Sequence, residues 1–181
     1  MDLRRRVYFL LPAAVAALLQ NALHEGVHYL AATAWGEEVL EFRFLTNGWL
    51  TSQVVYATPV AQRSGLHWLA IAWLPALATT GIGYLLFASR RHLLTNQPRV
   101  NAFLWYLGVF FLLIDPLYFA VLSLFVGGDL GAVDVVGWNP WTVRLPAVGV
   151  LLFNFRLVMR WRREASAQPE RYLAKRGTTS R

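Results

Sequence analysis

Long apolar stretches alternate with short polar segments along the chain, and their spacing predicts the main elements of the fold. An α-helix needs about 20 mostly apolar residues to cross the hydrocarbon core of a membrane. The stretches of this length cover approximately residues 7–35, 66–89, 100–126 and 141–161. The pattern therefore predicts an all-α membrane protein with about four transmembrane helices, which form one domain over residues 1–161.

A different pattern lies between the first two apolar stretches. β-prone residues surround Asn47-Gly48 in the segment from Val39 to Tyr56. Asn-Gly between two such runs is typical of a β-hairpin turn. We therefore expect a short β-hairpin over approximately residues 39–56, at the membrane surface. Because apolar and polar positions alternate imperfectly there, an irregular loop is the alternative.

The composition and the placement of charge support a membrane protein. The 181 residues are 56% hydrophobic and 15% charged, whereas soluble domains usually carry about 25% charged residues. The chain has no cysteine, which excludes a disulfide scaffold, a thiol enzyme and a Cys-ligated zinc domain. The net charge of +7 is concentrated at the predicted helix ends, in Arg4–Arg6, Arg90–Arg99 and Arg156–Arg181.

Such clusters are typical of the cytoplasmic ends of membrane helices. They predict that both termini are cytoplasmic, that residues 162–181 form a basic cytoplasmic tail, and that the protein lies in a plasma or inner membrane. A nucleic-acid partner is not expected, because no folded basic surface with base-stacking groups is visible. The alternative for the N-terminus is a signal peptide ending near Ala32-Thr33-Ala34.

The first apolar stretch contains the sequence His24-Glu25-Gly26-Val27-His28. Positions i and i+4 of a helix share one face, so both imidazoles can bind one metal ion. Glu25 lies beside the first histidine, close enough to act on a metal-bound water without binding the metal. This is the HExxH arrangement of zinc peptidases, with two histidine ligands and a carboxylate general base.

The location of these groups strengthens the metal hypothesis. An ionisable group at the centre of a membrane span costs about 2.5–3.5 kcal/mol on insertion scales, so the cluster requires a partner, and a bound cation is a natural one. The alternative is that the polar stripe lies at a wetted helix end and bonds to neighbouring helices.

A catalytic zinc site needs a third protein ligand and an open position for water. We expect this ligand to be Asp115, which lies deep in the third stretch at a depth near that of His24. The alternatives are Asp129 and Asp134, in the Gly-rich segment that follows that stretch. For Asp115 itself, an ion pair or a helix-bonding carboxylic acid is the alternative.

These features resemble the site-2-protease-like intramembrane zinc metallopeptidases. The resemblance rests on HEGVH in the first apolar helix, its Ala-rich continuation at residues 29–32, the β-prone segment at residues 39–56 and a carboxylate in a later stretch. It implies that His24 and His28 bind zinc, that Glu25 is the catalytic base and that an Asp is the third ligand. The Asn-Pro…Asp-Gly signature usual in that family is absent.

The expected function is hydrolysis of a peptide bond in or next to a transmembrane segment of a membrane-bound substrate. Glu25 would take a proton from the zinc-bound water, and the hairpin edge would hold an extended substrate by β-augmentation. One alternative is a metal-ion or proton transporter that uses the same His/Asp cluster. Another is a non-catalytic membrane scaffold. Two histidines and a carboxylate also suit iron or cobalt.

Overall fold

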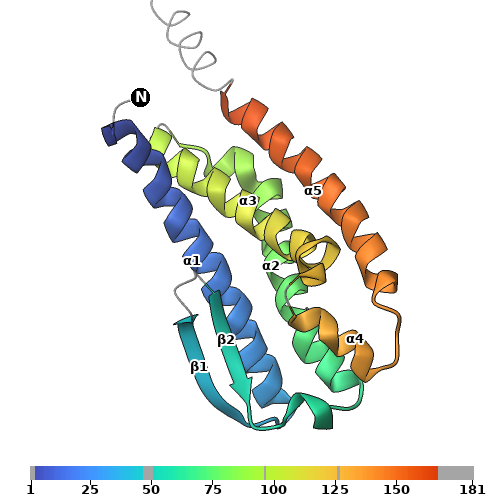
Figure 1. The fold of residues 1–181 in the computed structure, drawn as a ribbon. Helices are drawn as coiled ribbons and strands as arrows, with labels where there is room; N and C mark the ends of the chain where they lie inside the picture. Colours follow the sequence, from blue (N-terminus) through green and yellow to red (C-terminus); the bar gives the residue numbers. More distant parts are fainter. Residues whose placement is uncertain (1–2, 47–50, 96, 126, 167–181) are drawn as a thin grey trace, which may run out of the picture.

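The structure is a computed structural model, which describes residues 3–46, 51–95, 97–125 and 127–166. Its elements are α1 (Leu3–Ala34), β1 (Val39–Thr46), β2 (Thr51–Tyr56), η1 (Val60–Gln62), α2 (Leu66–Leu93), α3 (Pro98–Ala120), η2 (Leu122–Leu124), η3 (Asp129–Gly131), α4 (Ala132–Val135) and α5 (Trp141–Ser166). The long helices α1, α2, α3 and α5 run alternately up and down (Figure 1). The start of α1 and the end of α5 therefore lie at the same end of the molecule.

Three helical segments are long and apolar enough to cross a membrane: Leu66–Leu93, Pro98–Leu124 and Trp141–Glu164. The predicted fourth span, α1, is not among them in the part of the chain that the structure describes, so four spans are not confirmed. Several strongly polar side chains lie within nine residues in the second half of α1. These are Gln20, Asn21, His24, Glu25 and His28.

The predicted hairpin is confirmed. Strands β1 and β2 pair antiparallel, with Phe42 opposite Val54, although the Asn47-Gly48 turn lies outside the described residues. The hairpin runs beside the lower half of α1 (Figure 1). Val54 is buried, and the Asn21 amide donates a hydrogen bond of 2.8 Å to the Ser52 hydroxyl. These contacts fix β2 against the helix that carries the HExxH motif.

A proline in α3 creates an anchor for α5. Pro116 has no N–H, so the carbonyl of Leu112, four residues earlier, lacks its usual helical donor. The buried amide of Asn154 donates a hydrogen bond of 2.6 Å to this carbonyl. The same amide accepts a hydrogen bond of 2.8 Å from the Tyr84 hydroxyl of α2. Asn154 thus joins α5 to both neighbouring helices.

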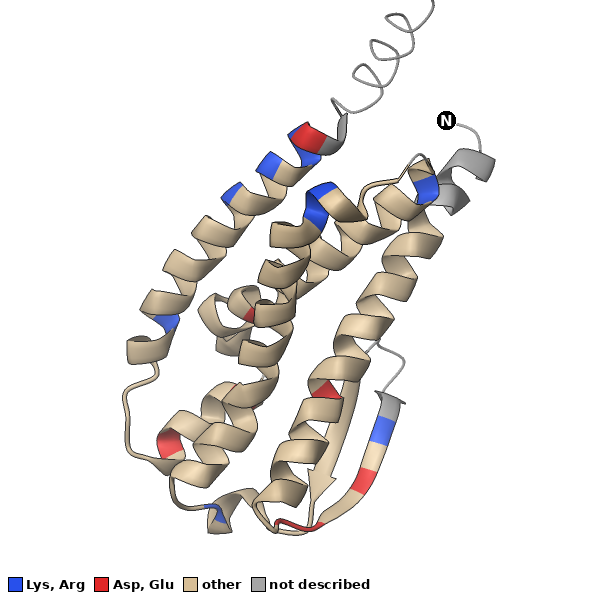
Figure 2. Ribbon diagram, turned by 180° about the vertical axis from the view of Figure 1, so that it is seen from behind, with Lys and Arg blue, Asp and Glu red and all other residues tan. Residues whose placement is uncertain are grey.

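The end of the bundle that holds the start of α1 and the end of α5 is basic. Most of the described arginines lie there (Figure 2). Arg90 of α2 donates two hydrogen bonds of 2.8 Å to the carboxylate of Glu164, which also pairs with Arg160 at 3.0 Å. These bonds support α5 as a helix as far as Ser166, beyond the predicted end at residue 161.

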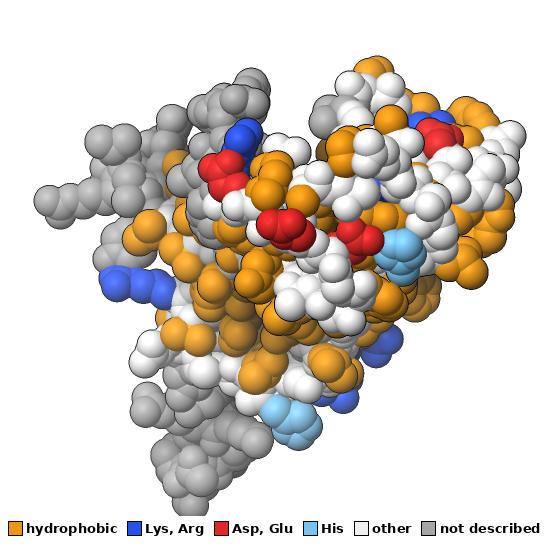
Figure 3. Space-filling view, turned by 90° about the horizontal axis from the view of Figure 1, so that it is seen from below, with side chains coloured by type: hydrophobic (Ala, Val, Ile, Leu, Met, Phe, Trp, Pro, Cys, Tyr) orange, Lys and Arg blue, Asp and Glu red, His pale blue; other side chains and the backbone are white. Residues whose placement is uncertain are grey.

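Acidic side chains, with a histidine beside them, gather on the opposite end of the molecule (Figure 3). There Glu37, which follows α1, lies 3.0 Å from Nε2 of His67 at the start of α2. The Thr58 hydroxyl donates a hydrogen bond of 2.9 Å to the same carboxylate. This network fixes the connection between the hairpin and α2, next to the HExxH segment.

Candidate metal centre

The HExxH segment lies in the half of α1 that packs against the hairpin and α2. The rings of His24 and His28 lie 5.0 Å apart, centroid to centroid, as expected for residues one helical turn apart. Asp129 lies across from both rings. Its Oδ2 is 3.3 Å from Nε2 of His24, and its Oδ1 is 3.3 Å from Nε2 of His28.

His24, His28 and Asp129 form a group that could hold a metal ion, since one ligand atom from each lies within 4.8 Å of the others. No other group of three or more such residues occurs in residues 3–46, 51–95, 97–125 and 127–166. Burial alone would raise the pKa of Asp129, but its contacts with the two histidines hold it well below its usual value. The carboxylate is therefore ionised and suited to a cation.

The backbone before Asp129 places this carboxylate. Gly128 has a φ of 135°, a conformation that side chains other than glycine rarely adopt. A Cβ at Gly128 would lie 2.5 Å from the Tyr118 hydroxyl, and this hydroxyl donates a hydrogen bond of 3.2 Å to the Gly127 carbonyl. Leu130 and Val133 are buried in the core formed with α2 and α3. The segment is thus folded back over the bundle.

Asp115 contacts His24 on its other nitrogen. Its Oδ1 lies 3.0 Å from Nδ1 of His24, without the geometry of a hydrogen bond. Its Oδ2 accepts hydrogen bonds from the Thr79 hydroxyl and, at 3.3 Å, from the Gln20 amide. Asp115 is only 4% exposed. It therefore braces the back of the His24 ring, outside the group of three.

His28 is oriented by a proline in α2. Pro75 has no N–H, which frees the carbonyl of Ile71 from the helical ladder. Nδ1 of His28 lies 2.9 Å from this carbonyl oxygen. Because a carbonyl only accepts hydrogen bonds, the proton of the neutral ring lies on Nδ1. Nε2 lies on the other side of the ring, 3.3 Å from Oδ1 of Asp129, and is the nitrogen that could bind a metal ion.

Glu25 lies next to the group without belonging to it. The side chain is buried and lies near the backbone of Val54 in β2. Tyr56 lies further along the same strand, with its ring 5.3 Å from that of Trp68. Burial and the negative charges of Asp129 and Glu25 raise the pKa of the Tyr56 phenol, which therefore stays protonated.

The structure brings together His24, Glu25 and His28, as the spacing of the motif predicts. Of the three aspartates considered as a third ligand, Asp129 lies in the group and Asp115 lies behind His24. Asp134 is exposed on α4 and is not part of the group. The sequence named Asp129 only as an alternative, because nothing in its spacing fixes how the Gly-rich segment folds back.

The chain matches no known family model, no curated protein and no solved structure. Its function is therefore inferred from the chemistry of the site.

Proposed function

We propose that the protein is a membrane-embedded zinc metallopeptidase that hydrolyses a peptide bond in or next to a transmembrane segment of its substrate. One observation carries the proposal. The Nε2 atoms of His24 and His28 converge on the carboxylate of Asp129, and Glu25 lies beside them without contributing to the group. Two imidazoles, one carboxylate and an open position form the ligand set typical of catalytic zinc.

The surrounding contacts support Asp129, rather than Asp115, as the third ligand. Histidines that bind metal ions usually donate their other ring N–H to a carboxylate or a carbonyl, which fixes the tautomer and the ring orientation. Nδ1 of His24 faces Asp115, and Nδ1 of His28 faces the Ile71 carbonyl. In this assignment each imidazole has one nitrogen for the metal ion and one for a supporting acceptor.

A zinc ion held here would supply a water molecule acidic enough to ionise near pH 7. Glu25 would accept a proton from this water and would later deliver it to the leaving amine. The backbone of Val54 lies near this carboxylate on the side of the hairpin. Burial of Glu25 keeps bulk water from competing for the proton.

The substrate must be locally extended, because a helical scissile bond has its carbonyl engaged in the backbone ladder. The hairpin supports this requirement. Strand β2 lies against the helix that carries the motif, with Val54 buried near Glu25. Strand edges hold extended peptides by β-augmentation. The substrate class is therefore a membrane protein or membrane-bound peptide with an unwound segment next to the membrane.

The charge distribution supports an orientation. The basic end of the bundle, with Arg90, Arg91 and Arg160, would face the cytoplasm of a plasma or inner membrane, following the positive-inside rule. Both termini would then be cytoplasmic. The metal centre lies in the opposite half of the bundle, so cleavage would take place toward the non-cytoplasmic side.

The test is Glu25→Gln, which keeps the shape of the side chain and removes its basicity. We expect cleavage of a membrane-inserted reporter to fall by about 10²–10⁴-fold, with zinc content unchanged. Glu41→Gln is the matched control, because Glu41 is exposed on β1 and pairs only with Arg43 in the described structure. Full cleavage by the Glu25→Gln variant would contradict the proposal.

A further inference from the structure

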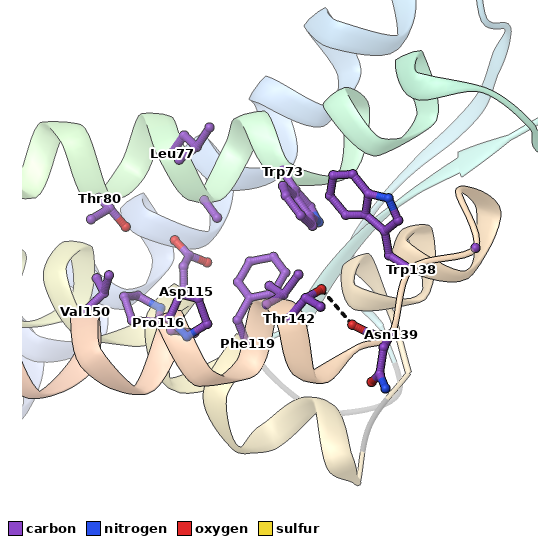
Figure 4. A pocket seen from close by; sticks show the side chains of 15 residues that line it. Trp73, Leu77, Thr80, Asp115, Pro116, Phe119, Trp138, Asn139, Thr142 and Val150 are labelled. Carbon is purple, nitrogen blue, oxygen red and sulfur yellow. Dashed lines mark hydrogen bonds between the residues drawn. The ribbon is translucent and has the colours of Figure 1, made fainter.

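A pocket of about 750 Å³ lies between α2, α3, α5 and the segment Gly137–Asn139 (Figure 4). It forms because α5 packs along α3, whereas the hydrogen bonds of α5 to α2, at Tyr84 and Arg90, lie beyond the pocket. None of the proposed zinc ligands lines the pocket, but Asp115 does. The pocket is thus a separate site that shares one wall with the metal centre.

One end of the pocket has an aromatic wall. The ring of Trp73 lies 6.4 Å from that of Phe119 and 6.3 Å from that of Trp138, centroid to centroid. The indole N–H of Trp73 is buried and has no hydrogen-bond acceptor in the described structure. The wall therefore offers aromatic faces together with one unsatisfied donor.

The pocket also contains a single acid. Asp115 is the only ionisable residue among those that line it. Its Oδ1 contacts only His24 in the described structure, and a carboxylate oxygen has a second lone pair for another donor. Figure 4 shows Asp115 beside Phe119, one helical turn away on α3. A buried carboxylate next to aromatic faces is suited to an organic ammonium group, which both attract.

The remaining wall is apolar and open to lipid. Leu77 of α2 is 67% exposed and Val150 of α5 is 39% exposed, and both line the pocket on the side where these helices separate. An alkyl chain can leave the pocket here and enter the bilayer. Asp115 lies five residues before the end of α3, about 8 Å of helix, and nine residues before the end of the apolar segment Pro98–Leu124, so a headgroup reaches the acid by entering the pocket.

We propose that this pocket binds a membrane amphiphile that carries an ammonium group. The ammonium lies between the aromatic wall and Asp115. An oxygen of the headgroup accepts a hydrogen bond from the Trp73 N–H, and the alkyl chain extends past Leu77 and Val150. This binding does not depend on peptidase activity. It has a consequence for the proposed metal site, because the ammonium would neutralise the negative charge of Asp115 that lies behind His24, so amphiphile and zinc each weaken the binding of the other.

The test uses a bromine-labelled long-chain alkylamine, with the corresponding fatty acid and alcohol as comparison probes. Bromine quenches tryptophan fluorescence on contact, and Trp73 and Trp138 line the pocket. In metal-free protein in a non-ionic detergent, we expect saturable quenching by the amine. Trp138→Phe removes part of this signal. The acid and the alcohol should bind at least about tenfold more weakly than the amine. Neither has a positive charge that would strengthen a hydrogen bond to Asp115.

Two variants make the result decisive. Asp115→Asn should lower the affinity for the amine by about tenfold or more, so that the amine no longer binds more tightly than the alcohol. Ala147→Phe fills the pocket from α5 without touching the acid and should block all three probes. Leu152→Phe, on the exposed face of the same helix, is the matched control. Equal quenching by all three probes, or full amine binding by Ala147→Phe, would overturn the proposal.

The coupling to zinc has its own readout. In wild type, a saturating concentration of the amine should lower the affinity for zinc, and the alcohol should not. An unchanged zinc affinity at saturating amine would overturn the coupling. If the protein binds no zinc, the proposed function fails, and the quenching of the metal-free protein still decides whether the pocket binds the amine.

Discussion

Two carboxylates reach His24 from opposite sides of its ring. Asp129, from the Gly-rich segment, faces Nε2, whereas Asp115, from the interior of α3, faces Nδ1. Only Asp129 also reaches His28. The difference shows that the depth of an acid in the bundle does not decide its role. An acid is placed to share a metal ion with both histidines only if it faces Nε2 of His24 and also Nε2 of His28.

The two regions also hold their carboxylates by different means. Asp115 is fixed by side chains of neighbouring helices, with hydrogen bonds from Thr79 and Gln20. Asp129 is fixed by its backbone, through the left-handed conformation of Gly128 and the packing of Leu130. A rigid, buried acid is suited to orient a ligand. A partly exposed acid at the end of a loop is suited to contact a metal ion that exchanges water.

The largest effect is expected from Asp129→Ala. Because this change removes the proposed third ligand, zinc content should fall from near-stoichiometric to background, as measured by mass spectrometry of the purified protein. Asp134→Ala, five residues further along, is the control and should keep its zinc. Near-stoichiometric zinc in the Asp129→Ala variant would show that the metal ion is held by another set of residues.

Asp115→Asn should have a smaller effect. The variant keeps the three proposed ligands but loses the negative charge behind His24, and removal of such a supporting carboxylate typically lowers metal affinity by about 10–100-fold. A competition titration with a zinc chelator measures this shift. If Asp115→Asn lost all zinc while Asp129→Ala kept it, the assignments of the two acids would be reversed.

Gly128→Ala tests the backbone that places Asp129. The new Cβ would meet the Tyr118 hydroxyl at 2.5 Å in a backbone conformation unfavourable for alanine, so we expect a stability loss of about 1–3 kcal/mol. Zinc affinity should fall by less than in Asp115→Asn. Gly127→Ala is the control, since a Cβ there meets nothing within 4 Å. Equal stability of the two variants would argue against this account of the loop.

The smallest effect is expected from Pro75→Ala. Alanine restores an N–H that competes with His28 for the Ile71 carbonyl. Zinc affinity should therefore fall by less than about tenfold, the lower limit for the loss of a supporting hydrogen bond. Pro146→Ala, in α5, is the control for removing a helix proline away from the metal centre. A zinc affinity unchanged from that of wild type would show that the carbonyl does not orient His28.

Local patterns predicted the long helices, the hairpin and the HExxH triplet, because each is encoded within a few turns of chain. The position of Asp129 was not predictable in the same way, since it depends on a segment that returns to the bundle after α3 has ended. Leu130 and Val133, three residues apart after Gly127-Gly128, were the available signal that this segment packs inward. Pro75, four residues after Ile71, was the corresponding signal for the carbonyl that receives His28.

The position of the metal ion distinguishes Asp129 from Asp115 as the third ligand. Crystals of the zinc-loaded protein, measured on both sides of the zinc absorption edge, would locate it by anomalous scattering. We expect a peak bound by Nε2 of His24, Nε2 of His28 and a carboxylate oxygen of Asp129, at about 2.0–2.2 Å from each, with Asp115 on the far side of the His24 ring. A peak between Nδ1 of His24 and Asp115, or no peak in the HExxH region, would contradict this expectation.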